Sequence, residues 1–101
     1  KMNLVEINME KISKLCAIHK VARLFVFGSV LRDTFNQDSD IDLIVDFDHV
    51  DLNHYADNYF DLKQKLEDIF NRSVDLLEEK AIKNPYLRKE LEKEKRLIYG
   101  S

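Results

Sequence analysis

The chain predicts an α/β domain in which a small mixed β-sheet is flanked by helices. Segments whose apolar residues recur every three or four positions, as in helices, alternate with short runs of β-branched and aromatic residues, as in strands. The chain has 101 residues but only two glycines and one proline, so we expect little irregular structure. No linker or repeat divides it, and we expect a single domain over residues 1–101.

The first predicted elements are a helix, a strand and a short helix. An apolar stripe through residues 3–20 predicts an amphipathic helix; its members are Ile7, Met9, Ile12, Leu15, Cys16 and His19. The run RLFVF at residues 23–27 ends at Gly28 and predicts a buried strand. A short helix is expected over residues 29–34, with Ser29 as its cap.

Residues 40–47, with the sequence DIDLIVDF, alternate in hydropathy as a half-buried strand does. One face of this strand carries Ile41, Leu43, Val45 and Phe47, and the other carries Asp40, Asp42, Ile44 and Asp46. The aspartates near and beyond the strand end are expected to face solvent; these are Asp46, Asp48 and Asp51.

The second half of the chain predicts a helix, a strand and a last helix. Residues 54–70 form an amphipathic helix whose expected core positions are Tyr55, Tyr59, Phe60, Leu62, Leu66, Ile69 and Phe70. Residues 73–79 are apolar at their centre and predict a third strand. Asn84 and Pro85 start the last helix, because proline suits a first turn. Residues 97–99 predict a short edge strand.

Composition argues against several classes of function. No apolar run approaches the ~20 residues that cross a membrane, and the first residues lack the apolar core of a signal peptide. The single cysteine, Cys16, cannot form an internal disulfide, which favours the cytoplasm, and it is expected to be a core residue. The net charge of −3 argues against nucleic acid as a direct ligand.

Asp40 and Asp42 predict a cation site. They stand two positions apart on one strand, so their carboxylates share a face with Cα atoms ~6.6 Å apart. Crowded carboxylates repel one another unless a cation lies between them. Such a pair suits Mg²⁺, and two ions can clamp the attacking and leaving oxygens of a phosphoryl transfer. Asp75 on the third strand is the candidate third ligand; the alternative is that these aspartates are merely solvated.

Two familiar ligand-binding loops are excluded, while the Gly28–Ser29 pair stays a candidate. An EF-hand loop starting at Asp38 fails because Leu43 stands where glycine is needed and His49 where glutamate is needed. The Gly-Lys-Ser/Thr ending of a Walker A loop is absent. Gly28 lets a ligand approach the backbone at a helix start, where free N–H groups attract phosphate, and Ser29 adds a hydroxyl donor.

These residues together resemble a known signature. Gly28 and Ser29, followed after ten residues by Asp40-x-Asp42, resemble the signature of the DNA polymerase β-type nucleotidyltransferases. The chain is similar over nearly its whole length to the smallest branch, the minimal nucleotidyltransferase (MNT) domains. The resemblance implies the nucleotidyltransferase fold, Mg²⁺ binding by Asp40 and Asp42, and Asp75 as the third catalytic carboxylate. It also implies that Gly28 and Ser29 hold the phosphates of the nucleotide.

The resemblance further implies a partner and a reaction. MNT proteins are commonly encoded beside a HEPN-domain RNase toxin and act as its antitoxin, which implies that AMP passes from ATP to a tyrosine of that toxin. Many relatives carry arginine directly after the Gly-Ser pair; here Val30 follows, and Arg32 is expected to supply that charge. Because 101 residues leave no room for an acceptor-binding domain, the partner is expected to supply the acceptor surface.

Two alternative functions stay open. One is a catalytically idle antitoxin that neutralises its partner by binding alone, and the other is a nucleotidyltransferase that acts on a small molecule. The basic segment over residues 80–96 also allows two interpretations. Its acidic and basic residues three apart predict a solvated helix; examples are Glu90 with Lys93 and Glu92 with Lys95. Alternatively, one basic residue faces the triphosphate or the partner; the candidates are Lys83, Arg88 and Lys89.

Overall fold

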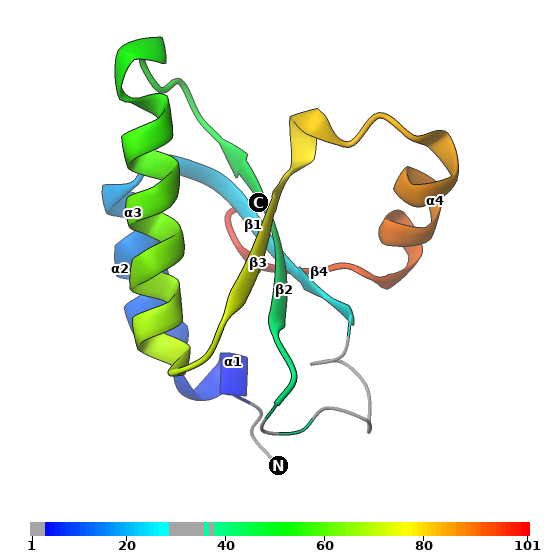
Figure 1. Cartoon of the computed structure of the whole chain (residues 1–101), viewed down its shortest axis with the longest axis horizontal. Coiled ribbons are helices and arrows are strands. Elements are labelled where there is room, and N and C mark those ends of the chain that lie inside the picture. Colours follow the sequence, from blue (N-terminus) through cyan, green and yellow to red (C-terminus); the bar gives the residue numbers. More distant parts are fainter. Residues whose placement is uncertain (1–3, 29–35, 37) are drawn as a thin grey trace.

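The computed structural model describes residues 4–28, 36 and 38–101, so the predicted helix over 29–34 lies outside the described residues. A four-stranded sheet has helices on both faces (Figure 1). In chain order the elements are α1 Leu4–Ile7, α2 Met9–Ile18, β1 Val21–Phe27, β2 Ile41–Phe47, α3 Leu52–Phe70, β3 Val74–Glu78, η2 Glu79–Ala81, α4 Pro85–Glu94 and β4 Arg96–Tyr99. None of the helices in this described part is long and apolar enough to cross a membrane.

The sheet is mixed, as the sequence predicts. Its strand order is β3-β2-β1-β4, in which β2 runs parallel to β3 and β1 runs antiparallel to both β2 and β4. Helix α3 makes the crossover that the parallel pair β2 and β3 requires. The predicted α/β class, a small mixed sheet flanked by helices, is therefore confirmed.

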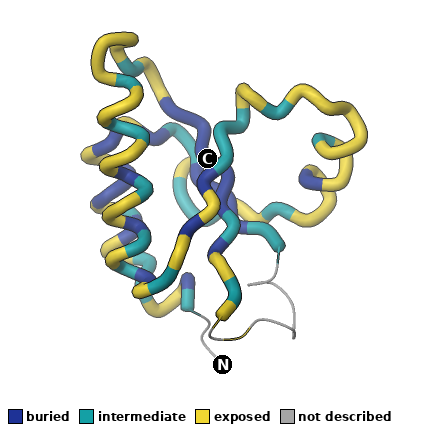
Figure 2. The backbone as a smooth tube through the Cα atoms, in the orientation of Figure 1, coloured by how far each residue is buried: buried dark blue, intermediate teal, exposed yellow. Residues whose placement is uncertain are grey.

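One face of the sheet packs against α2 and α3. The alternating apolar residues of β2 are buried there together with residues of both helices; the set includes Ile12, Cys16, Ile41, Leu43, Val45, Phe47, Leu62, Leu66 and Phe70. Figure 2 shows this burial along the strands and the inner sides of the two helices. Burial raises the pKa of the Cys16 thiol to about 12, which keeps it protonated as a core residue.

Helix α4 lies over the other face and is mostly exposed (Figure 2). Within α4, every residue of which is described, only Leu91 is buried, and it forms a small cluster with Phe25 and Ile44. The helix begins as predicted, with Pro85 in its first turn and the Asn84 side chain accepting hydrogen bonds from two backbone N–H groups. Few apolar contacts therefore hold α4 to the sheet.

The first predicted helix is interrupted in the structure. The sequence predicts one helix over residues 3–20, whereas α1 and α2 are separated at Asn8. The Asn8 side chain donates to the Leu4 carbonyl at 2.9 Å, and its backbone N–H donates to the Val5 carbonyl at 3.1 Å. These local bonds compete with the regular helical ladder. Ile7, expected in the apolar stripe, is 63% exposed, so that prediction is wrong.

Two other predictions about burial are wrong. Asp46 was expected to face solvent, but it is only 7% exposed, because the Arg23 guanidinium and neighbouring groups of the α4 face cover it. Phe60 was expected in the core, but it is 64% exposed and lies edge-on against Tyr59. The other expected core positions of α3 are buried or half-buried, so the apolar stripe identifies the packed side correctly and Phe60 is the exception.

Candidate active site

Strand register brings three of the predicted site residues together. Asp42 on β2 is paired on one side with Asp75 of the parallel strand β3. On its other side Asp42 is paired with Phe27, the residue directly before Gly28. Neighbouring strands lie about 4.8 Å apart, so Phe27, Asp42 and Asp75 stand at one level across three strands, with Gly28 directly after Phe27. Their neighbours along each strand are buried under α2 and α3, so the two aspartates lie on the α4 face.

The backbone at the end of β1 lies directly against the Asp42 carboxylate. Gly28 has a φ of +76°, in the left-handed region that favours glycine. A Cβ built at this position would overlap Oδ2 of Asp42. Glycine at this position therefore keeps the carboxylate approachable from the side of β1, as a phosphate-binding or cation-binding site requires.

The three predicted carboxylates differ in their surroundings. Asp40 is exposed just before β2, Asp42 is half-buried, and Asp75 is exposed on the edge strand β3. Asp40 and Asp42 each interact with other groups of the chain. Among the described residues, no three His, Cys, Asp or Glu side chains are gathered closely enough to hold a metal ion. Ser29 and Arg32 lie outside the described residues, so the metal and phosphate roles stay predictions.

Arg72 supports the segment that leads into Asp40, and sequence analysis missed it. Its Nη1 donates to the carbonyl oxygens of Asn36 at 2.8 Å and Ser39 at 2.9 Å. Arg72 stands in the turn between α3 and β3, and the Ser73 carbonyl accepts a hydrogen bond from the N–H of Ile41. These contacts tie the start of β2 to the start of β3. No local pattern signals them, because the partners lie more than thirty positions apart.

A buried carboxylate lies farther along the same face. Nη2 of Arg23 lies 2.7 Å from Oδ2 of Asp46, and Nζ of Lys80 lies 3.6 Å from Oδ1 of Asp46. The hydrogen bond and charge of Asp46 raise the pKa of Arg23. Alternation along β2 assigns Asp46 to this face, but it cannot show which groups cover it.

The basic segment contacts this face through Arg88. Its Nη1 donates to Oε1 of Glu79 at 2.8 Å, and this contact raises the pKa of Arg88. The two predicted ion pairs of the segment are present, Glu90 with Lys93 at 3.6 Å and Glu92 with Lys95 at 2.7 Å. The solvated-helix interpretation is confirmed for Glu90 and Lys93, whose side chains are 65% and 62% exposed, but it is wrong for Lys95, whose side chain is only 13% exposed. Arg88 is half-buried within the fold.

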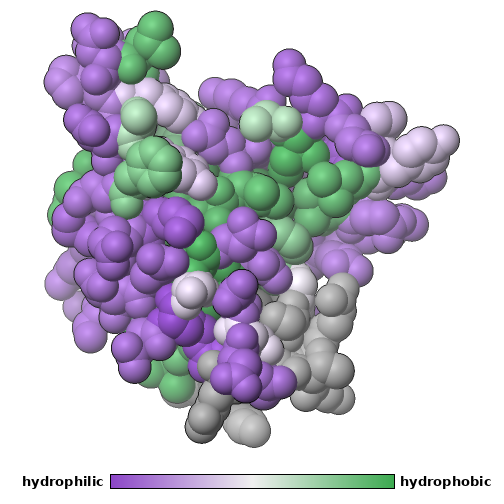
Figure 3. Space-filling model, in the orientation of Figure 1, coloured by the Kyte–Doolittle hydropathy of each residue, from purple (hydrophilic) through white to green (hydrophobic). Residues whose placement is uncertain are grey.

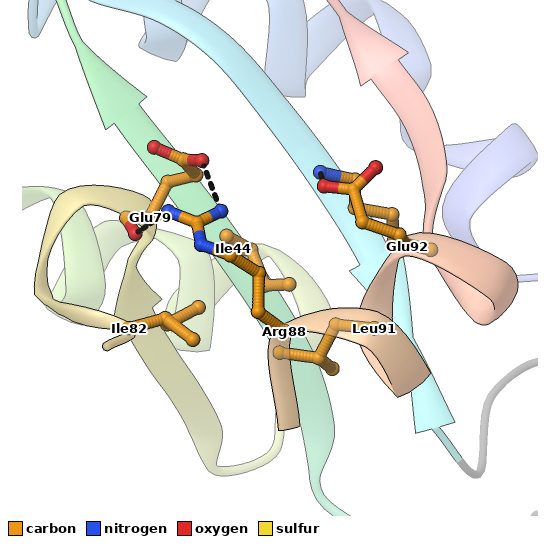
Figure 4. Close-up of a pocket in the computed structure, with 7 residues that line it drawn as sticks. Ile44, Glu79, Ile82, Arg88, Leu91 and Glu92 are labelled. Carbon is orange, nitrogen blue, oxygen red and sulfur yellow. Dashed lines mark hydrogen bonds and ion pairs between the residues drawn. The ribbon is translucent and has the colours of Figure 1, made fainter. Parts of the chain in front are cut away.

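A small pocket lies between α4, η2 and β2 (Figure 4). Its lining residues are Ile44, Glu79, Ile82, Arg88, Leu91, Glu92 and Lys95. The Lys95 ammonium also lies 4.2 Å from the centroid of the Phe25 ring, a cation–π contact. Figure 3 shows apolar surface in the middle of this view, bordered by hydrophilic side chains. The pocket was not predicted from the sequence.

Comparison with known sequences establishes the class of protein. The family model of the nucleotidyltransferase domain matches residues 9–98. The chain belongs to this family and is a nucleotidyltransferase, which confirms the predicted resemblance. A Methanocaldococcus jannaschii protein assigned as a protein adenylyltransferase, MJ1379, is 38% identical over 81 residues. That match covers 80% of this chain and 78% of the relative.

Two solved structures share the architecture. One is described as a minimal nucleotidyltransferase; it is 33% identical with a TM-score of 0.76, and the match covers 94% of this chain and 95% of that one. The other is a toxin–antitoxin crystal structure with AMP-PNP; it is 27% identical with a TM-score of 0.71, covering 93% of this chain and 74% of that one. These similarities confirm the predicted nucleotidyltransferase fold.

Proposed function

We propose that the chain transfers AMP from ATP to a tyrosine hydroxyl of a HEPN-family RNase toxin and thereby acts as its antitoxin. The observation that carries the proposal is the register that sets Asp42 between Asp75 and Phe27, the residue directly before Gly28. Similarity to a protein adenylyltransferase and to a toxin–antitoxin structure with AMP-PNP supports a protein acceptor and an adenine nucleotide. Residues 1–101 would act as one catalytic domain in the cytoplasm.

The phosphates of ATP would lie at the end of β1. Gly28 brings the backbone close to the Asp42 carboxylate without an intervening side chain. Ser29 would donate its hydroxyl to a phosphate oxygen, and Arg32 would add positive charge. The phosphates would then lie beside the carboxylates of Asp42 and Asp75, which are paired across β2 and β3.

Asp40, Asp42 and Asp75 would hold Mg²⁺, as two ions, once their side chains turn closer together than they lie in the described structure. Carboxylate oxygens are the ligands that this cation prefers, and the glycine at position 28 leaves Asp42 approachable. When bound, the ions supply positive charge that stabilises the phosphates during transfer. Asp42 and Asp75 come from hydrogen-bonded neighbouring strands, so the sheet itself fixes the spacing of their backbones.

Asp75 would receive the proton in the transfer. The tyrosine oxygen bonds to the α-phosphorus of ATP while the bond from that phosphorus to the bridging oxygen breaks, and pyrophosphate leaves. The hydroxyl proton passes to the Asp75 carboxylate. Asp75 is exposed on an edge strand, where an incoming tyrosine can reach it.

The test is to incubate the chain with its purified partner toxin, ATP and MgCl₂, and to measure the intact mass and RNase activity of the toxin. We expect a gain of one adenylyl group per modified tyrosine and loss of RNase activity. Asp42→Asn and Asp75→Asn should abolish the mass gain. Asp57→Asn is the matched control, because Asp57 is an exposed aspartate of α3.

Each alternative function has a distinct result in the same experiment. An inhibited but unmodified toxin would establish the idle antitoxin and overturn the transfer reaction. A toxin that is neither modified nor inhibited would overturn the antitoxin role and leave a small-molecule acceptor as the surviving function.

A further inference from the structure

The described residues that lead into Asp40 are joined to one another by local hydrogen bonds. The Asn36 N–H donates to Oγ of Ser39 at 3.1 Å, and the Ser39 N–H donates to the Asn36 carbonyl at 3.1 Å. The Asn36 side-chain oxygen accepts from the Asp38 N–H at 2.8 Å. Asn36 and Asp38 are exposed and lie before β2 begins, so these local bonds alone do not fix the segment relative to the sheet.

Arg72 ties this segment to the rest of the fold. One guanidinium nitrogen, Nη1, donates to both the Asn36 carbonyl at 2.8 Å and the Ser39 carbonyl at 2.9 Å. Arg72 is half-buried, and its own backbone is held at the end of α3, where its N–H donates to the Glu67 carbonyl at 3.3 Å. The Ser39 carbonyl belongs to the peptide group directly before Asp40, so the bond from Arg72 orients that peptide group.

The same arginine stands at the start of the strand that carries Asp75. Ser73, the residue after Arg72, accepts a hydrogen bond from the Ile41 N–H at 3.0 Å, and Asp75 follows two positions later. A side-chain bond and a backbone bond therefore join the starts of β2 and β3 at neighbouring points. Together they fix the spacing between the backbones of Asp40 and Asp75, as a site built on rigid elements requires.

We propose that Arg72 is a positioning residue for adenylyl transfer, an inference that rests on the proposed function. Among the described residues, the acidic side chains are not gathered closely enough to hold a metal ion. With the peptide before Asp40 held by Arg72, only side-chain rotation is needed to bring the Asp40 carboxylate toward Asp42 and Asp75. Removal of a group that orients a metal ligand in this way typically costs roughly 10–100-fold in metal affinity or activity.

The charge of Arg72 predicts the opposite effect on a cation. Its guanidinium bonds to the carbonyl of the residue before Asp40, so its positive charge repels a cation held there. If charge were its only contribution, removing Arg72 would tighten Mg²⁺ binding. Loss of the two hydrogen bonds instead releases the peptide before Asp40 and weakens Mg²⁺ binding. The sign of the change in Mg²⁺ requirement therefore separates positioning from charge.

The test compares the wild type with Arg72→Ala, Arg72→Lys and Asn58→Ala. Asn58→Ala is the matched control, because Asn58 also donates from its side chain to a distant carbonyl, that of His19 at 2.8 Å, but at the end of the sheet where β1 begins. The first measurement, amide hydrogen exchange of Ile41 by NMR, uses the chain without metal or nucleotide. The second is the free Mg²⁺ concentration that gives half-maximal adenylyl transfer to the partner toxin at a fixed ATP concentration. Circular dichroism verifies folding, and Arg72→Lys carries the test if Arg72→Ala is unfolded.

We expect Arg72→Ala to speed exchange of the Ile41 N–H several-fold and to raise the half-maximal Mg²⁺ concentration roughly tenfold or more. Arg72→Lys should show smaller changes in both, because it keeps the charge and donor groups but loses the planar guanidinium. Asn58→Ala should change neither.

Two sets of results would contradict the inference in different ways. An unchanged or lowered Mg²⁺ requirement in Arg72→Ala, or exchange of the Ile41 N–H at the rate of the wild type, would overturn the positioning role and leave the proposed function in place. A wild type that transfers no adenylyl group at any Mg²⁺ concentration would overturn the proposed function and this inference with it.

Discussion

The two faces of the sheet are built differently. The face under α2 and α3 is packed with apolar side chains, whereas among the described residues the face under α4 has three buried apolar side chains and a set of ion pairs. Apolar burial stabilises roughly in proportion to the area removed from water. Partly exposed ion pairs contribute little by comparison. We infer that the first face supplies most of the folding free energy, which leaves the second face to carry charged groups and bind ligands.

The largest effect on folding should come from the packed face. Leu66 on α3 is fully buried, so Leu66→Ala removes buried methyl groups and leaves a cavity. We expect the free energy of unfolding to fall by about 2–5 kcal/mol. Urea unfolding followed by circular dichroism measures it. Leu97→Ala on β4 is the control, because that leucine is 45% exposed. Equal losses in the two variants would contradict the assignment of stability to the α2–α3 face.

The next prediction compares alanine substitutions at two glycines, both of which should lower stability while only one should disturb the Asp42 carboxylate. Gly28 and Gly100 both have positive φ, and a Cβ at either position would overlap a neighbouring oxygen. We expect Gly28→Ala and Gly100→Ala each to lower the free energy of unfolding by about 1–3 kcal/mol. Only Gly28→Ala displaces the Asp42 carboxylate, because a Cβ at Gly100 would meet the Ala22 carbonyl instead.

Titration of the two variants with ATP and MgCl₂ checks this separation. Gly100→Ala should bind ATP as the wild type does, whereas Gly28→Ala should lose most of its affinity. If both variants lost ATP affinity equally, the effect would come from general destabilisation, and the close approach of Gly28 to Asp42 would have no special role.

The sequence predicts the packed face better than the α4 face. Alternation over residues 40–47, interrupted only at Ile44, identifies the side of β2 that packs on the helices and the aspartates Asp40 and Asp42, because side chains in a strand have a period of two. The same alternation places Asp46 on the polar side, yet Asp46 is buried. The Arg23 and Lys80 side chains contact the Asp46 carboxylate. These contacts depend on the tertiary fold and leave no pattern in the local sequence.

Three further features of the structure could not be predicted from the sequence. The break at Asn8 reflects a local competition between side-chain and backbone hydrogen bonds, which apolar periodicity does not detect. Arg72 donates hydrogen bonds to Asn36 and Ser39, which lie more than thirty positions earlier in the chain. No local sequence motif can therefore predict that Arg72 holds the start of β2. The pocket under α4 combines three elements that a linear pattern cannot bring together.

A smaller effect is expected from a carboxylate at the edge of the packed face. The N–H of Val74 donates to Oε2 of Glu67 at 2.9 Å, and Lys63 lies 3.3 Å away, so the pKa of Glu67 is lowered, chiefly by the Val74 bond. A lowered folded-state pKa stabilises the fold above the unfolded value of about 4.3. That stabilisation is lost as the pH falls through the folded-state pKa.

Glu67→Gln should therefore flatten the pH dependence of stability below about pH 4.3. Thermal unfolding between about pH 2 and pH 7 measures this dependence in the wild type and the variant. The variant should be less stable than the wild type at neutral pH, where the charged form of Glu67 stabilises the fold, and the two should converge as the pH falls through the folded-state pKa. Glu10→Gln on the exposed surface of α2 is the control, and an equal flattening there would remove the special role of Glu67.

The smallest effect should come from the exposed ion pairs of α4. Glu90 and Lys93 are 3.6 Å apart with side chains 65% and 62% exposed, whereas Glu79, the partner of Arg88, has a side chain only 19% exposed. Solvent screens the first pair, so Glu90→Gln should change the free energy of unfolding by less than about 0.5 kcal/mol. Glu79→Gln should cost more, because it leaves the half-buried Arg88 without its charged partner. Urea unfolding at low and high salt separates the two, since the exposed pair should respond more strongly to screening than the partly buried pair. If the costs were equal, α4 would be held to the sheet by Leu91 alone, and the ion pairs would serve only to line the pocket.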